Sequence, residues 1–152
     1  MAPRHPAQPD LLEWQPPATV VAFEPAHVRA ATVAASIARA VAATLRDCGQ
    51  PRDEVAERMS AYLGERVSKP MLDAYASEAR REHAIPVTRL IALMHATGDR
   101  RLLQLLAEPM GWAVIERRHL PLIEVAAIRE KEDELRRTRE QLMREARKAG
   151  GA

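Results

Sequence analysis

The clearest candidate for chemistry is a group of basic and polar side chains between residues 66 and 81. Guanidinium, ammonium and hydroxyl groups donate hydrogen bonds to phosphate oxygens, and a helix has the right diameter to enter the major groove of DNA. A carboxylate within such a group opposes phosphate but can accept a hydrogen bond from cytosine. The candidate DNA-binding residues are Arg66, Ser68, Lys69, Asp73, Ser77, Arg80 and Arg81.

Two short helices are expected to position this group. The first runs from about Pro51 to Leu63 and ends at Gly64, because glycine favours the left-handed conformation that closes a helix. The second begins at Ser68, a residue type common at helix N-termini, and continues to about Ser77. The sequence therefore predicts a helix pair joined by a glycine-bearing turn.

The apolar positions of the second helix decide which side faces out. Leu72 and Tyr75 lie three residues apart and share one face, which we expect to pack inward. The outward positions are then Lys69, Asp73, Ala74 and Ser77. This is the layout of a helix-turn-helix motif, and it is also that of an ordinary helical hairpin within a bundle.

Other residue types that could do chemistry lack the spacing that catalysis or ligation needs. The histidines show no H-E-x-x-H pattern, and the glycines form no phosphate-binding loop. The single cysteine, Cys48, allows no internal disulfide, and its place near the end of an alanine-rich helix favours a small core residue. We therefore expect no enzyme, no metal site and no other cofactor.

Length and composition favour one compact domain with an additional arm or tail. The chain has 152 residues, of which 47% are hydrophobic, and its 23 basic and 21 acidic residues give a net charge of +2. Such a charge permits binding to nucleic acid without requiring it. The sequence has no apolar run of about 18 residues and no signal peptide, so we expect a cytoplasmic protein that does not enter membranes.

Residues 1–25 are predicted to form an extended, proline-rich arm, since they hold six of the eleven prolines. Its apolar residues should dock either on the body of this chain or on a phage or host protein. They are Leu11, Leu12 and Trp14, followed by the segment from Val20 to Phe23. Tryptophan is favoured at binding hot spots, which makes Trp14 the main candidate anchor.

Residues 26–115 are predicted to form a body of four or five helices, which makes the fold all-α. One helix should run from Pro25 to Gly49, and another should start at Pro86 and end at Gly98. The inward faces should carry Val33, Ile37, Val41 and Leu45 in the former and Val87, Leu90, Ile91 and Met94 in the latter. Asp99 should cap a further short helix, and the apolar residues 112–115 form a short strand or a docking segment.

Residues 116–152 are predicted to form a long charged helix. Ile128, Leu135 and Leu142 repeat at seven residues, but the positions midway between them are polar, which gives half of a coiled-coil seam. We expect weak self-association through this row, giving a homodimer. The alternative is a solvated helix held by four-residue ion pairs such as Glu132–Arg136 and Glu140–Arg144.

The chain resembles helix-turn-helix regulatory proteins of Mu-like transposable prophages, which are similar to phage CII-type regulators. The resemblance covers roughly residues 10–130. Its strongest segments are LLEWQPP at residues 11–17, MSAYLG at 59–64, VSKPMLDAYASEAR at 67–80 and WAVIER at 112–117. It implies a bacterial, phage-derived DNA-binding regulator of transcription.

Two functions are therefore expected as alternatives. The first is sequence-specific binding to double-stranded DNA, in which a palindromic site would require a dimer. The second is a non-enzymatic interaction adaptor in phage transposition or replication, in which the arm and the C-terminal helix bind proteins and the helix pair is only scaffold.

Overall fold

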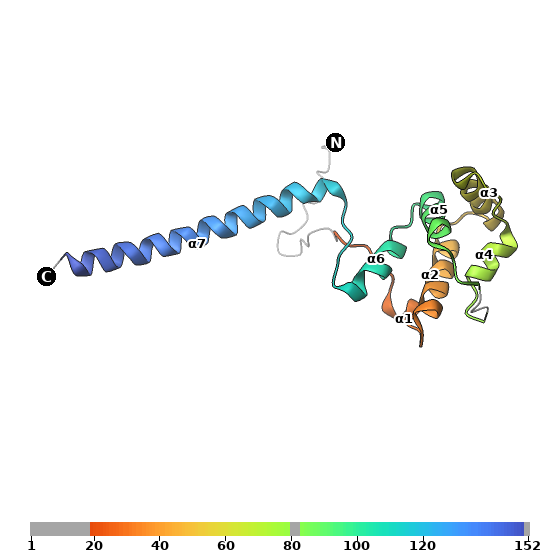
Figure 1. Cartoon of the computed structure of the whole chain (residues 1–152), viewed down its shortest axis with the longest axis horizontal. Helices are drawn as coiled ribbons and strands as arrows, with labels where there is room; N and C mark the ends of the chain where they lie inside the picture. Colours follow the sequence, from red (N-terminus) through yellow and green to blue (C-terminus); the bar gives the residue numbers. More distant parts are fainter. Residues whose placement is uncertain (1–18, 80–82, 151–152) are drawn as a thin grey trace, which may run out of the picture. The chain divides into compact units, whose positions relative to one another are not determined.

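The computed structural model describes residues 19–79 and 83–150. These residues are all-helical and contain no strand (Figure 1), which confirms the predicted fold class. The chain divides into two compact units, of which the first ends at Val114 and the second begins at Ile115. Residues 112–115, for which a strand was one expectation, are irregular, and the Val114 amide donates a hydrogen bond to Gln104 Oε1 at 2.7 Å.

The first unit begins with two helices where the sequence predicts one. Helix α1 (Pro25–Val28) is followed by Arg29, and helix α2 (Val33–Asp47) is preceded by Thr32. The backbone is extended at both Arg29 and Thr32. The Thr32 hydroxyl accepts a hydrogen bond from the Ala35 amide at 3.2 Å, which caps the new helix. The predicted continuous helix is thus wrong, and Val33, expected to be buried, lies in the first turn of α2 with 76% of its surface exposed.

Four more α-helices complete the first unit. They are α3 (Arg52–Leu63), α4 (Lys69–Tyr75), α5 (Val87–Thr97) and α6 (Arg101–Ala107). Gly64 and Gly98 end α3 and α5 at φ values of 70° and 72°, as predicted for left-handed terminal glycines. Helix α3 packs against α4 and most extensively against α5, and α2 contacts α1, α4 and α6 (Figure 1).

The buried face of α5 differs from the prediction. Leu90 is buried, but Val87 is 71% exposed and Ile91 is also exposed. The remaining buried positions are Ala92, Leu93 and Ala96. Alanine side chains are small and allow two helices to approach closely, so the face of α5 that carries Ala92 and Ala96 packs against α3. A prediction from the large aliphatic residues alone therefore gives the wrong buried stripe.

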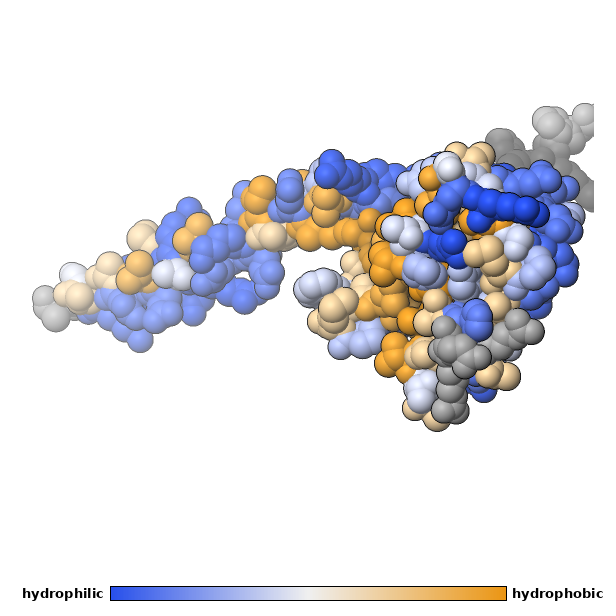
Figure 2. All heavy atoms as spheres, turned by 45° about the vertical axis from the view of Figure 1, so that its right-hand side comes forward, coloured by the Kyte–Doolittle hydropathy of each residue, from blue (hydrophilic) through white to orange (hydrophobic). Residues whose placement is uncertain are grey.

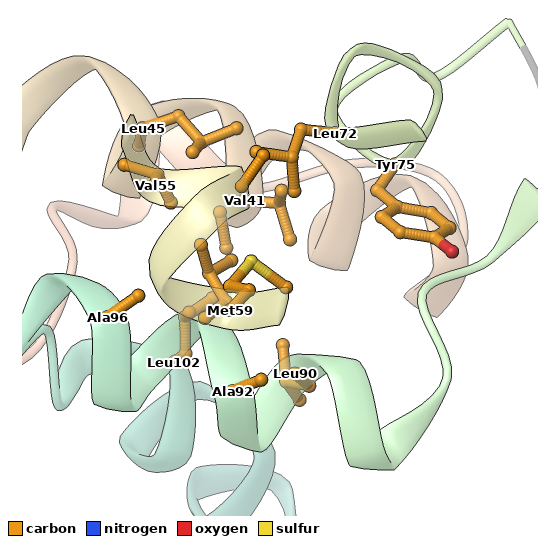
Figure 3. Packing of buried hydrophobic residues seen from close by; sticks show 14 of the residues in the cluster. Val41, Leu45, Val55, Met59, Leu72, Tyr75, Leu90, Ala92, Ala96 and Leu102 are labelled. Carbon is orange, nitrogen blue, oxygen red and sulfur yellow. The ribbon is translucent and has the colours of Figure 1, made fainter. Parts of the chain in front are cut away.

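A continuous apolar core joins these helices. Met59, Leu72, Leu93 and Leu102 are its largest fully buried side chains, and Figure 3 shows Met59 among residues from neighbouring helices. Phe23 belongs to the core although it precedes the predicted start of the body, and the guanidinium of Arg101 lies 4.3 Å from its ring centroid. Leu11, Leu12 and Trp14, the predicted docking residues of the arm, lie outside the described residues.

A polar network ties α2 to the start of α6. The buried Thr44 hydroxyl donates to Asp99 Oδ2 at 2.8 Å, and Arg101 forms ion pairs with Asp99 at 2.7 Å and Asp47 at 3.0 Å. Asp99 also accepts from the Arg101 amide, but the residue that precedes α6 is Arg100, so the predicted capping position is off by one residue. Burial raises the pKa of Asp99, but hydrogen bonds from Arg101 and Thr44 outweigh it and hold the pKa below its ordinary value.

The second unit consists mainly of helix α7 (Leu120–Ala149), preceded by a 3-10 turn over Arg117–His119. Its 30 residues correspond to a length of about 45 Å. Figure 2 shows hydrophilic side chains over much of its surface, with apolar ones in patches. The ion pairs along α7 join residues three apart, Lys131–Glu134 and Asp133–Arg136, rather than the four-residue pairs that the sequence predicts.

In α7, all of which the structure describes, no residue is buried. Ile128, Leu135 and Leu142 are 59%, 58% and 59% exposed and therefore available to a partner. None of the helices within the described ranges combines the length and the apolar character needed to cross a membrane.

Candidate nucleic-acid interface

The connection between α3 and α4 is fixed by one serine. Ser60, in the last turn of α3, accepts a hydrogen bond from the Val67 amide at 2.8 Å, and its hydroxyl lies 2.7 Å from the Ala56 carbonyl oxygen. The Val67 side chain is buried beneath the connection. Ser60 thus satisfies a backbone donor that the turn would otherwise leave unpaired and ties the connection, at Val67, to the last turn of α3.

Helix α4 presents its apolar side to the core, as predicted. Leu72 and Tyr75 are buried and point from α4 toward the interior (Figure 3). Lys69 lies exposed, and Asp73 and Ser77 are half-buried. Ala74, predicted to face outward, is buried instead, although it does not belong to the apolar core cluster.

Ser68 occupies the residue before α4, where the sequence places it. Its backbone carbonyl accepts hydrogen bonds from the amides of Met71 and Leu72 at 3.0 and 3.1 Å. Its side chain makes no capping hydrogen bond within the described residues, so the predicted position is right while the predicted capping contact does not form. The half-exposed hydroxyl remains at the surface of the helix pair.

The outward side of α4 carries a charge triad. Asp73 is bridged by Lys69, whose Nζ lies 3.0 Å from its carboxylate, and by Arg52 from the first turn of α3. Hydrogen bonds from Arg52 and Lys69 lower the pKa of Asp73 below its ordinary value. Lys69, the central DNA-binding candidate, is therefore already paired, and a phosphate that binds it competes with Asp73.

A second arginine braces the other side of α4. The Arg89 guanidinium, from α5, donates to the Tyr75 hydroxyl, lies 5.9 Å from the ring centroid of Tyr75 and pairs with Glu65 at 3.3 Å. The hydrogen bond to Tyr75 and the contact with Glu65 raise the pKa of Arg89, although burial opposes them. These contacts fasten the connection and α4 to α5.

The remaining candidates are spread unevenly. Arg66 is exposed in the connection, one residue from the braced Glu65. Arg80 and Arg81 lie outside the described residues. Between residues 52 and 75, which span α3 and α4, the chain has four basic and five acidic residues, so the helix pair carries a net charge of −1.

Sequence reasoning missed three residues that shape this surface. Ser60 resembles any helical serine, and only its contact with Val67 reveals its role. Arg52 and Arg89 lie 21 and 14 residues from their partners Asp73 and Tyr75, and no short-range pattern predicts such pairs.

No family model, curated protein or solved structure matches this chain. In the part of the chain that the structure describes, no group of three or more histidine, cysteine, aspartate or glutamate side chains could hold a metal ion.

Proposed function

We propose that this chain is a sequence-specific, DNA-binding transcription regulator of a Mu-like prophage and works in the cytoplasm. The observation that carries the proposal is the packing of α3 and α4. Their inward contacts leave Lys69 and Asp73 on one exposed side of α4, between Arg66 and Ser77. The resemblance to prophage regulators supports the biological setting.

The triad suggests how an acidic residue can belong to a DNA-binding surface. When Lys69 turns toward a phosphate or a guanine, Arg52 still pairs with Asp73, so the carboxylate does not become an unpaired negative charge against the DNA. Asp73 then remains able to accept a hydrogen bond from cytosine. Because the helix pair has a net charge of −1, affinity on this surface depends on the placement of a few cations rather than on overall attraction.

Binding of fluorescent duplex DNA, measured by anisotropy over a series of salt concentrations, tests the proposal. Lys69→Ala should weaken binding to all sequences and reduce the salt slope by about one unit if Lys69 contacts phosphate. If Lys69 reads guanine, the loss should be about 1–3 kcal/mol and confined to sites that carry that base. Asp73→Ala should tighten non-specific binding if repulsion dominates, or relax specificity if cytosine is read.

Arg46→Ala provides the matched control, because Arg46 is exposed at the end of α2 and its loss changes the net charge by the same amount. Circular dichroism must show that each variant is folded, since Leu72 and Tyr75 are core residues. If the wild-type protein shows no salt-dependent binding to duplex DNA at about 50 mM salt, where non-specific binders are retained, the proposal is wrong.

A palindromic site would require two copies of the chain, and the exposed row on α7 offers a surface for the second copy. Replacing Leu135 and Leu142 with serine should shift the protein to a monomer in sedimentation while the first unit unfolds at an unchanged temperature. A wild-type protein that is monomeric at tens of micromolar would contradict self-association.

The same exposed row supports a second candidate, the interaction adaptor. Three large apolar side chains at seven-residue spacing fit a helix of another protein as well as a second copy. An adaptor should lose its protein partner when Leu135 and Leu142 are replaced, and it should bind duplex DNA no better than the Lys69→Ala variant does.

A further inference from the structure

The charges of α7 are segregated along its length. From Leu120 to Leu135 the helix has two basic and five acidic residues, whereas from Arg136 to Ala149 it has six basic and two acidic ones. The C-terminal half of α7 thus carries a net charge of +4, compared with −1 for residues 52–75, which span α3 and α4 and hold the proposed DNA-contacting helix. The C-terminal half of α7 is therefore more basic than the helix pair that the helix-turn-helix layout predicts to bind DNA.

All six basic residues of this half are exposed, and three of its arginines lie around one hollow. Arg139, Arg144 and Arg147 are exposed, and together with Glu140 and Met143 they line a shallow hollow of about 400 Å³. At 100° per residue the three arginines fall within an arc of about 140° on one side of the helix. Glu140 is the one acidic residue of the hollow.

These arginines differ from Arg52 and Lys69 at the proposed DNA-binding surface, both of which pair with Asp73. Within residues 19–79 and 83–150, no ion pair joins Arg139, Arg144 or Arg147 to a carboxylate, although Arg136 pairs with Asp133. An exposed guanidinium without a carboxylate partner exchanges only water and counterions when it binds an anion, whereas Lys69 must first leave Asp73.

The helix dipole does not explain the segregation of charge. Its effect is confined to the first and last turns of a helix. The first turn of α7 contains no acidic residue, and the acidic run from Glu130 to Glu134 lies in the middle of the helix. Of the basic residues, only Arg147 and Lys148 lie in the last turn.

We infer that the basic side of the C-terminal half of α7 is a second nucleic-acid contact, in which Arg139, Arg144 and Arg147 bind backbone phosphates. Five of the six basic residues in this half are arginines, whose planar guanidinium groups form paired hydrogen bonds with phosphate oxygens. A contact of this kind reads no sequence and adds affinity to whatever sequence the first unit selects. The inference extends the proposed function, since it names where most of the phosphate affinity arises.

The composition of this half favours nucleic acid over a membrane surface. A helix that lies in a membrane interface buries a broad face of large apolar side chains. From Arg136 to Ala149 the only such residues are Leu142 and Met143, and Met143 lies in the basic hollow rather than opposite it. The apolar area is too small to insert, while the density of guanidinium groups suits a polyanion.

The test compares two triple variants of the full chain. Arg139→Gln, Arg144→Gln and Arg147→Gln together remove the proposed contacts, and glutamine preserves helix propensity. The control replaces Arg29, Arg46 and Arg118, exposed arginines outside the basic hollow, with glutamine and so reaches the same net charge. Anisotropy is measured with a duplex of arbitrary sequence at about 50 to 200 mM salt, the range over which phosphate contacts dominate affinity.

Each phosphate contact contributes about 0.9 to the slope of log affinity against log salt, so the α7 variant should lose about 2.7 units of slope. Across a fourfold change in salt, the wild type should then lose about 40-fold more affinity than the α7 variant does. The control should keep the wild-type slope. Equal slopes for the wild type and the α7 variant would overturn the inference, as would a control that loses as much as the α7 variant.

Two further outcomes separate this inference from its alternatives. In the first, the wild type binds anionic lipid vesicles, the α7 variant does not, and both bind duplex DNA equally. This result would assign the basic side to membranes and overturn the inference. If Lys69→Ala lowers the affinity for duplex DNA and the α7 variant does not, the proposed function stands and the inference of a second contact is wrong. The reverse result would keep the contact on α7 and reject α4 as the DNA-binding helix.

Discussion

The first unit and α7 use the same residue types in opposite ways. In the first unit, leucines and valines from successive helices meet in one core, and arginines such as Arg52, Arg89 and Arg101 pair with acidic or hydroxyl groups. In α7, leucines and isoleucine lie exposed in a row, and Arg139, Arg144 and Arg147 form no ion pair within the described ranges. The first unit thus buries an apolar core and pairs these arginines within itself, whereas α7 leaves its apolar row and these arginines exposed.

This contrast locates stability and binding in different parts of the chain. A long helix with no buried residue gains little from tertiary packing and depends on helix propensity and local ion pairs. The first unit, by contrast, should unfold cooperatively because its helices share one core. Substitutions matched in chemistry but placed in the two regions should therefore have very different effects.

The largest difference is expected when the same Leu→Ala substitution is made once in each region. Leu93 is completely buried between helices, so Leu93→Ala should lower the free energy of unfolding of the first unit by about 2–5 kcal/mol. Leu135→Ala, which removes the same atoms from an exposed position, should change it by less than about 0.5 kcal/mol. Urea denaturation followed by circular dichroism measures both. Equal effects would show that α7 is part of the cooperative core.

The buried polar network should give the next largest effect. Thr44→Val keeps the shape of the side chain but removes the hydroxyl that donates to Asp99. Leaving a partly buried acceptor without its donor should cost about 1–3 kcal/mol of unfolding free energy. A matched change at the exposed Thr138, whose hydroxyl bonds only to the Glu134 carbonyl within α7, should cost much less. A neutral Thr44→Val would mean that Arg101 alone satisfies Asp99.

The sequence predicts much of this fold because several signals are local. Gly64 and Gly98 mark helix ends, since a positive φ is inexpensive only for glycine, and both occupy that conformation in the structure. Leu72 and Tyr75 share the inward face of α4 because residues three apart in a helix lie on the same side. The long helix α7 likewise follows from the charged residues 122–148, which contain no glycine or proline.

The incorrect predictions arise where tertiary packing outweighs local pattern. Val33 and Val87 both fall in the first turn of a helix, where the neighbouring helix no longer covers the apolar stripe, so periodicity alone places them inside. Ala74 is too small to register as a core residue in a sequence, yet it is buried. The Arg52–Asp73 pair depends on how α3 crosses α4, which no local spacing encodes.

Acidic pH should destabilise the first unit more than α7, because the first unit contains carboxylates with lowered pKa values. Hydrogen bonds hold the pKa of Asp47, Asp73 and Asp99 below the ordinary value of about 3.9. A group whose pKa is lower in the folded than in the unfolded state stabilises the fold above the unfolded value. That contribution is lost as the pH falls below about 4 through the folded value.

The midpoint of urea unfolding, measured between about pH 7 and pH 3, should therefore fall most steeply below about pH 4. In an Asp99→Asn variant, which cannot titrate at this position, the fall should be shallower and the midpoint at neutral pH should already be lower. Since Asp47 and Asp73 are each partly accessible to solvent, added salt should weaken their share. A midpoint that does not change with pH would contradict the lowered pKa values.

The smallest effects are expected from exposed ion pairs, and even these should differ between the regions. Arg39 and Glu78, 2.7 Å apart, join α2 to the segment that follows α4, whereas Lys131 and Glu134 lie three residues apart within α7. Glu78→Gln should lower the unfolding free energy of the first unit only slightly, because exposed pairs are screened by solvent and salt. Glu134→Gln should leave that unfolding unchanged and reduce only the helix content of α7, by an amount equivalent to about 0.2–0.5 kcal/mol.

A double-mutant cycle on each pair, followed at low and high salt, would measure the coupling energies. If the Lys131–Glu134 pair altered the unfolding of the first unit as much as the Arg39–Glu78 pair does, the independence of α7 would be wrong.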